Sequence, residues 1–301
     1  TGARVRVPPV PGIDLENIFL LRTAEDARRL KRRFAMARDV VVVGGGFIGL
    51  ELAATARLLG KTVTVLEAAP RLMGRVVAPA ISAYFLDLHR AMGTTIRLET
   101  PVHGIIGENG QAVAVETLSG ERIPADTVIV GVGVVPNVEL AEAAGLHVAN
   151  GIVVDEAMRT SDPRIVAAGD AVSFHHWALG RSVRLESVQN AVDQAKTGVA
   201  ALLGKGEAYR AVPWFWSDQG DAKLQMVGLS NDANSSVLRG RPEDGSFSVF
   251  HYRDDELVAI DSVNRAGDHM LGRRMLGSGF QLDKAVAADE GVDLKKLVLA
   301  G

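Results

Sequence analysis

Three glycines in the first third of the sequence have the spacing of a phosphate-binding turn. Gly44, Gly46 and Gly49 form the pattern G-x-G-x-x-G, and Glu67 follows Gly49 by 18 positions. Glycines so placed permit a tight turn, admit a pyrophosphate close to the backbone, and let a helix pack closely on a strand. The pyrophosphate binds at the helix N-terminus, where the helix dipole is positive. A glycine-rich turn that holds no ligand is the alternative.

The neighbouring residues predict the elements that such a turn requires. The valine run of Asp39–Val43 is typical of a strand buried on both faces. A helix is expected from about Ile48 to Leu59, ended by Gly60, and a second strand over Thr62–Leu66. Together they predict a β–α–β unit with parallel strands.

An earlier helix is expected over Thr23–Ala37. Thr23 is a plausible N-cap, and Asp26, three residues on, completes an acidic variant of the capping box.

The acid at the end of the second expected strand bears on cofactor choice. A carboxylate at Glu67 accepts hydrogen bonds from ribose hydroxyls and repels a 2′-phosphate, which favours NADH over NADPH. Arg71 and Arg75 lie nearby and would soften this preference by facing the phosphate. For Arg71, an ordinary solvated arginine is an equal alternative.

Two further segments carry candidate binding residues. Gly169 and Asp170 follow a short apolar run, Ile165–Ala168, that we expect to be a strand. The Asp170 carboxylate either accepts hydrogen bonds from a polyol or only caps the turn, and the spacing alone does not decide. Trp214 and Trp216 would share one face of a strand, either in a core or at an interface.

Six segments resemble one known family: residues 1–4, 44–51, 131–137, 160–170, 186–191 and 213–219. They are similar to the FAD-dependent pyridine nucleotide oxidoreductases. The string Pro-Trp-Phe-Trp-Ser-Asp-Gln resembles the ferredoxin reductase branch, both putidaredoxin reductase-like and biphenyl dioxygenase ferredoxin reductase-like. The resemblance implies an α/β fold with Rossmann-like dinucleotide-binding domains, of the glutathione-reductase-like two-dinucleotide type, plus a C-terminal α+β domain. Members begin with an FAD-binding segment that this sequence lacks, so we expect a piece of a longer protein.

The resemblance also implies domain limits and residue roles. We expect an NAD-binding domain with its entry segment over 1–132, part of the FAD-binding domain over 133–208, and an α+β partner domain over 209–301. Glu51 would lie near the nicotinamide and Trp216 near the flavin, facing the protein acceptor, as the catalytic residues. NAD(H) contacts are implied for Gly44, Gly46, Phe47, Ile48, Gly49, Glu51, Glu67, Arg75, Gly133 and Val134. FAD contacts are implied for Arg22, Gly169, Asp170, Val188 and Trp216.

The implied function is electron transfer from NADH through FAD to a [2Fe–2S] ferredoxin that serves a cytochrome P450 or a ring-hydroxylating dioxygenase. The cofactors supply the chemistry, so no protein nucleophile is needed. One alternative is a related enzyme, such as an NADH oxidase or a nitrite-reductase flavin subunit. Another is a truncated NAD-binding module without flavin activity.

Composition limits other roles. The net charge is −3 and there is no cysteine, which excludes a redox dithiol, a thiolate metal site and a global field that attracts nucleic acid. No apolar run approaches the ~18 residues of a membrane helix, and a cytoplasmic location is the simplest expectation. The adjacent His175 and His176 diverge on any regular element, so no metal site is expected.

A group of arginines in the last third of the sequence is the candidate surface for an acidic ferredoxin. An ordinary charged, solvated face explains the same residues equally well. The group consists of Arg239, Arg241, Arg265, Arg273 and Arg274.

Overall fold

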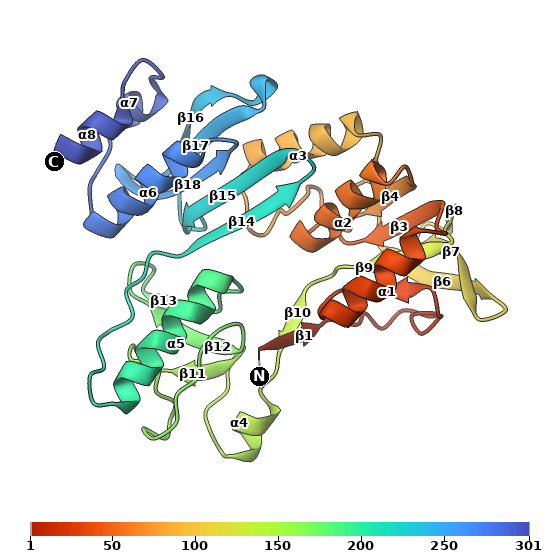
Figure 1. Cartoon of the computed structure of the whole chain (residues 1–301), viewed down its shortest axis with the longest axis horizontal. Helices are drawn as coiled ribbons and strands as arrows, with labels where there is room; N and C mark the ends of the chain where they lie inside the picture. Colours follow the sequence, from red (N-terminus) through yellow and green to blue (C-terminus); the bar gives the residue numbers. More distant parts are fainter. Residues whose placement is uncertain (1, 301) are drawn as a thin grey trace. The chain divides into compact units, whose positions relative to one another are not determined.

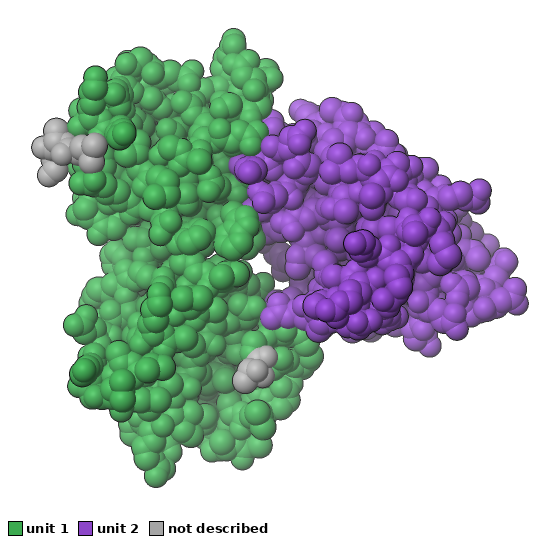
Figure 2. Space-filling model, viewed as in Figure 1, with its two compact units in different colours: residues 1–4, 135–216, 224–301 green, residues 5–134, 217–223 purple. Residues whose placement is uncertain are grey.

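A computed structural model describes residues 2–300 (Figure 1). The chain divides into two compact units, coloured separately in Figure 2. Unit 2 contains residues 5–134 and 217–223, and unit 1 contains the other described residues. Among residues 2–300, no helix is both long and apolar enough to cross a membrane.

Unit 2 is built on a five-stranded sheet whose strand pairs are all parallel. Its strands, in spatial order, are β2 (Ile18–Phe19), β9 (Thr127–Val130), β3 (Asp39–Val43), β4 (Thr62–Leu66) and β5 (Thr95–Arg97). Its helices are α1 (Ala24–Phe34), α2 (Phe47–Leu58) and α3 (Pro79–Ala91). The valines of β3 are buried on both faces, as predicted, because the strand lies in the middle of the sheet.

A small antiparallel sheet packs against this parallel sheet. It consists of β6 (Val102–Glu108), β7 (Gln111–Thr117) and β8 (Arg122–Pro124). Ile105, Val115 and Ile123 of the small sheet share one apolar core with Val41 and Val128 of the large one. This core joins the small antiparallel sheet to the parallel sheet of unit 2.

The first part of unit 1 is a small sheet with one long helix. Its elements are β1 (Ala3–Val5), β10 (Val134–Pro136), α4 (Glu139–Ala143), β11 (Ile152–Val154), β12 (Val172–His176), β13 (Arg181–Val183) and α5 (Val188–Leu202); β1 and β10 join the two units along the chain. The expected strand over Ile165–Ala168 is wrong: only Val166 forms a bridge, to Arg159. Since the Ile165 amide bonds to Asp162, the segment continues a turn.

The last part of unit 1 is an antiparallel sheet covered by helix α6, as Figure 1 shows. Its strands are β14 (Trp214–Gln219), β15 (Ala222–Gly228), β16 (Ser235–Arg241), β17 (Ser246–Arg253) and β18 (Glu256–Val263); β14 and the turn after it extend into unit 2. A 3-10 turn, η1 (Pro242–Asp244), precedes α6 (Ala266–Ser278), α7 (Lys284–Ala288) and α8 (Leu294–Ala300). Phe250, Ile260 and Met275 form the core between sheet and helix.

Candidate functional site

The glycine turn between β3 and α2 has the geometry that its spacing predicts. Gly44 has φ +106°, and a Cβ there would lie 2.5 Å from the Gly131 carbonyl oxygen. A Cβ on Gly49 would lie 2.2 Å from the Gly44 carbonyl oxygen and 3.2 Å from a methyl group of Val42. The first glycine therefore makes the turn, and the third lets α2 lie directly against the turn and β3.

The start of α2 provides the space that a pyrophosphate needs. Gly46 is the N-cap and offers no side-chain hydrogen bond to the helix, and a Cβ there would meet nothing within 4 Å. Phe47 and Ile48 form the first turn of α2, at the positive end of the helix dipole. The turn therefore fits a dinucleotide: its backbone would hold the pyrophosphate at the positive end of the helix dipole.

Glu67 also shapes the loop that it was predicted to serve. One carboxylate oxygen accepts the Gly45 N–H at 2.6 Å and the other accepts the Ala69 N–H at 2.7 Å. Each carboxylate oxygen retains a second lone pair for a ribose hydroxyl. Glu67 therefore fixes the middle of the glycine turn, while its role toward ribose stays a prediction.

The two arginines near Glu67 have different surroundings. The Arg71 guanidinium donates to the carbonyls of Val77 and Gly74, each at 2.6 Å, and to Ser82 Oγ at 3.2 Å. Neither role considered for Arg71, solvated side chain or phosphate ligand, fits these bonds; it fastens its own loop. Arg75 is exposed, and its guanidinium lies next to Gly133, directly before the half-buried Val134.

Glu51 lies on α2 and is half-buried. Its carboxylate accepts a hydrogen bond from Ser217 Oγ at 2.6 Å. Burial raises the pKa of the Glu51 carboxyl group, and the bond from Ser217 opposes that shift. Sequence reasoning missed Ser217 and its neighbour Gln219 as site residues. The available signal was alternation, since both occupy the face of β14 opposite Trp216 and are buried.

Trp216 stands on the exposed face of β14, with 40% of its surface accessible. The Trp214 ring lies 5.7 Å from it on the same face, as the predicted strand requires. The Arg273 guanidinium lies 4.6 Å above the Trp214 ring, and the buried His269 meets that ring edge-on. The tryptophan pair is therefore joined to α6 on one side.

In unit 1, Gly169 and Asp170 lie against the start of α5. Gly169 has φ +83°, and a Cβ there would lie 3.2 Å from the Ala191 side chain. The Gly169 N–H donates to Gln194 Oε1 at 2.8 Å, while the buried Gln194 Nε2 has no hydrogen-bond partner among the described residues. Val188 opens α5 and is 62% exposed. A buried, unpaired donor beside Asp170 and an accessible helix start fit the polar part of a flavin nucleotide.

Three other residues singled out in the sequence are Arg22, His175 and His176. Arg22 is exposed in unit 2, and its backbone N–H donates to Asp26, which forms the predicted capping box with Thr23. His175 is exposed and His176 is buried on β12, so the two diverge as expected. Among the described residues, no three potential ligands form a metal-binding group.

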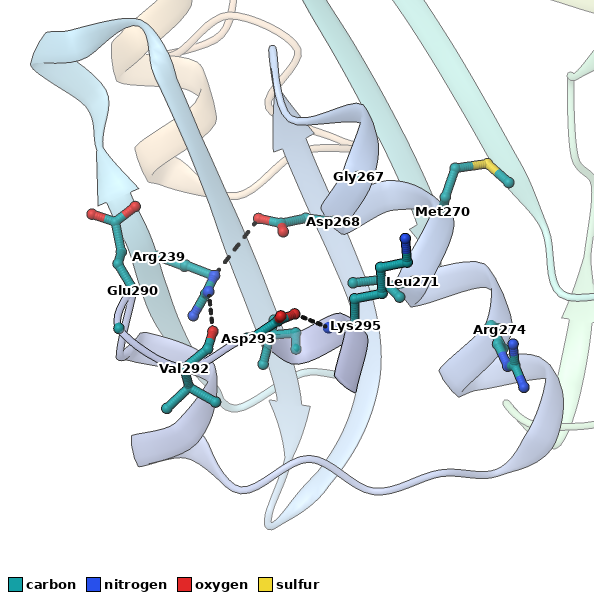
Figure 3. Close-up of a pocket in the computed structure, with 12 residues that line it drawn as sticks. Arg239, Gly267, Asp268, Met270, Leu271, Arg274, Glu290, Val292, Asp293 and Lys295 are labelled. Atoms are coloured by element: carbon teal, nitrogen blue, oxygen red, sulfur yellow. Dashed lines mark hydrogen bonds and ion pairs between the residues drawn. The ribbon is translucent and has the colours of Figure 1, made fainter. Parts of the chain in front are cut away.

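The five arginines do not form one surface. Arg239 is 6% exposed and donates to the carbonyls of Ala287, Asp289 and Val292, so it fastens the C-terminal segment to β16. It lines a cavity of about 630 Å³ together with Asp268 and residues 290–295 (Figure 3). Arg241 pairs with Asp244, and Arg265 with Asp268 and Glu290. Within residues 2–300, Arg273 and Arg274 are the exposed members with no carboxylate partner.

A parallel sheet with a glycine turn at the carboxyl end of its central strand, an acid directly after the next strand and an open helix start defines a dinucleotide-binding protein of the Rossmann class. Comparison with known proteins then gives the family. Residues 1–195 match the family model described as pyridine nucleotide-disulphide oxidoreductase, and residues 214–298 match one described as reductase C-terminal.

Curated relatives align over nearly the whole chain. The chain is 48% identical to rhodocoxin reductase of Rhodococcus erythropolis over 98% of its own length and 69% of that protein's. It is 43% identical to putidaredoxin reductase of Pseudomonas putida over 100% of its length and 72% of that protein's. A crystal structure of a ferredoxin reductase from Rhodopseudomonas palustris superposes with TM-score 0.97 at 47% identity, covering 99% of this chain and 74% of that one.

The chain belongs to the pyridine nucleotide-disulphide oxidoreductase family. The predicted family, the predicted fold class and the predicted cofactors, FAD and NAD(H), are thereby confirmed. The roles of individual residues and the three domain limits stay predictions.

Proposed function

We propose that this protein is an NADH-dependent FAD oxidoreductase that passes electrons to a [2Fe–2S] ferredoxin serving an oxygenase. The observation that carries the proposal is that the relatives at 43% to 48% identity, aligned over nearly all of this chain, are reductases named for their small redox partners. One solved structure with TM-score 0.96 is a covalent putidaredoxin reductase–putidaredoxin complex.

The chain's own residues divide the work between the two dinucleotides. The α2 start holds the pyridine nucleotide, Glu67 orders the glycine turn, and Glu51 presents a carboxylate one helical turn further on. Gly169, Asp170 and the start of α5 would hold the flavin nucleotide. When bound, the flavin supplies the conversion from a two-electron donor to a one-electron acceptor. The protein contributes position, charge and the exclusion of water.

The two faces of strand β14 have different surroundings. Trp216 points to the exposed face and Ser217, the next residue, points inward to Glu51. We infer that the exposed side, with Trp214 and Arg273, receives the iron–sulfur protein, since aromatic and arginine side chains are enriched in interfaces. A cytoplasmic location and the domain limits near residues 132 and 208 belong to the same proposal.

The test is anaerobic reduction of candidate [2Fe–2S] ferredoxins by NADH and the FAD-supplied protein, followed by ferredoxin absorbance. We expect catalytic ferredoxin reduction with slow reaction toward oxygen. Fast oxygen consumption without ferredoxin reduction would instead identify an oxidase. A purified protein that binds NADH but retains no flavin absorbance would identify a binding module.

A further inference from the structure

Four side chains from three segments of unit 2 form a continuous hydrogen-bonded line that ends at the Glu51 carboxylate. His89 Nε2 lies 3.0 Å from Gln219 Oε1, Gln219 Nε2 lies 3.2 Å from Ser217 Oγ, and Ser217 Oγ lies 2.6 Å from Glu51 Oε1. His89, Ser217 and Gln219 are each fully buried. Gln219 Nε2 also faces the Met73 sulfur at 3.6 Å.

With Glu51 ionised, the donors and acceptors in this line have one consistent assignment. An ionised carboxylate only accepts, so Ser217 spends its single hydroxyl proton on Glu51. Ser217 Oγ must then accept from the Gln219 amide, which directs the Gln219 carbonyl oxygen to His89 and places the imidazole proton on Nε2. A flipped Gln219 amide would require two protons from one hydroxyl group. Every donor therefore points toward Glu51.

We propose that Ser217 and Gln219 are positioning residues that hold the Glu51 carboxylate ionised and aimed at the pyridine-nucleotide site. This inference deepens the proposed function and rests on it for the place of the nicotinamide. The benefit is electrostatic: a nicotinamide ring becomes positive when it loses hydride, so a fixed negative charge beside it favours NAD⁺ over NADH. Ser217 and Gln219 of β14 thereby acquire a role distinct from that of Trp216.

The other groups near Glu51 do not replace this role. The Asp218 backbone N–H also donates to Glu51, but its side-chain charge raises the pKa of the Glu51 carboxyl group, as burial does. Burial lowers the pKa of the His89 imidazole and so disfavours a positive charge on it. Ser217 is thus the side-chain donor that favours the ionised carboxylate, and Gln219 keeps its hydroxyl oriented.

The test measures the affinities for NAD⁺ and for NADH by calorimetry from pH 5.5 to 8.5. Wild type, Ser217→Ala, Ser217→Thr, Glu51→Gln and the double variant Ser217→Ala/Glu51→Gln are compared. At pH 7 we expect the ratio of NAD⁺ affinity to NADH affinity to fall roughly tenfold in Ser217→Ala. Part of this ratio should return at higher pH, because Glu51 would then ionise about one pH unit above its transition in wild type. Ser217→Thr, which keeps the hydroxyl group, should restore the wild-type ratio.

Glu51→Gln should show the low NAD⁺ preference at every pH, and adding Ser217→Ala should change nothing further. Ser248→Ala, which removes a buried serine bonded to Asp268 instead, is the matched control and should keep the wild-type ratio. A Ser217→Ala ratio equal to wild type at every pH overturns the inference. Wild type that binds neither nucleotide would overturn the proposed function itself.

A second measurement applies even where Ser217→Ala fails to fold. Infrared difference spectra of the wild type and of Gln219→Met, with Glu51→Gln as the reference, report the carbonyl band of a protonated Glu51. We expect this band to appear at higher pH in Gln219→Met than in wild type. Coincident titrations of the two proteins overturn the role of Gln219.

Discussion

The Ser217 hydroxyl group donates to the Glu51 carboxylate across 166 positions of sequence, at 2.6 Å. Ser217 belongs to a strand of the C-terminal antiparallel sheet, whereas Glu51 belongs to the helix that starts at the glycine turn. One strand thus places an exposed aromatic residue and a buried donor in consecutive positions. The bond links the part of the chain expected to meet the protein acceptor with the part expected to hold the nucleotide.

Alanine substitutions at Gly49 and at Gly46 are expected to have different effects on stability and NADH binding. Gly49→Ala places a methyl group 2.2 Å from the Gly44 carbonyl oxygen, so the helix must shift. We expect it to destabilise unit 2 by about 1–3 kcal/mol and to weaken NADH binding at least tenfold. Gly46→Ala meets open space in the protein and should keep the melting temperature but still weaken NADH binding. Undiminished NADH affinity in Gly46→Ala would show that the pyrophosphate does not lie there.

Glu67, which directly follows β4, is expected to control both loop order and cofactor choice. Glu67→Gln loses one of the two carboxylate acceptors that hold Gly45 and Ala69. We expect kcat/KM for NADH to fall about tenfold and the preference over NADPH to narrow, because the 2′-phosphate is no longer repelled. Arg71→Met is the control: it removes two bonds within its loop and one to Ser82 of α3, and should lower Tm while keeping the cofactor ratio. An unchanged NADH/NADPH ratio in Glu67→Gln would contradict the assignment.

Much of unit 2 was predictable because its signals are local. The capping box at Thr23, the valines of β3 and the glycine spacing each depend on near neighbours, and the structure confirms all three. Helix α1 nevertheless ends at Phe34, short of the expected Ala37, since helix ends depend weakly on sequence. The strand expected over Ile165–Ala168 failed because an apolar run of four residues does not distinguish a strand from a turn.

The long-range parts of the site were beyond such reasoning. Nothing in the sequence pairs Ser217 with Glu51, or directs Arg239 to the carbonyls around Asp289. Arginines are mostly exposed, so grouping Arg239 with the candidate docking residues followed the general rule. Its burial depends on where the C-terminal segment returns to β16, which only the tertiary structure gives.

The docking hypothesis now rests on two of the five arginines. Arg273 and Arg274 are exposed on α6, and Arg273 lies over Trp214. We expect the charge reversals Arg273→Glu and Arg274→Glu to raise the apparent KM for ferredoxin about tenfold, most strongly at low salt, while NADH-driven dye reduction is spared. Arg241→Glu, at a residue already paired with Asp244, serves as the charge-matched control and should have a smaller effect. Unchanged ferredoxin kinetics in both reversals would remove this surface from the proposal.

The buried histidine beneath Trp214 should make the stability of unit 1 sensitive to acid. His269 is 2% exposed, and its pKa is lowered from 6.5 to about 4, chiefly by burial and further by the Arg273 charge. Above pH 6.5 the residue is neutral in both the folded and unfolded states, so its burial does not lower the free energy of unfolding. As the pH falls from 6.5 toward 4, the unfolded chain takes up a proton that the folded chain refuses, so stability is lost.

Between pH 7.5 and pH 5 this single group should lower the free energy of unfolding by about 2 kcal/mol. His269→Phe keeps a ring against Trp214 and should flatten that part of the pH dependence in urea unfolding followed by tryptophan fluorescence. His176, whose pKa burial likewise lowers to about 4, accounts for a further loss with the same sign. The exposed His147 provides the control, since it is not buried as His269 and His176 are, and His147→Asn should leave the slope unchanged. If His269→Phe loses as much stability on acidification as wild type, the buried neutral histidine is not the cause.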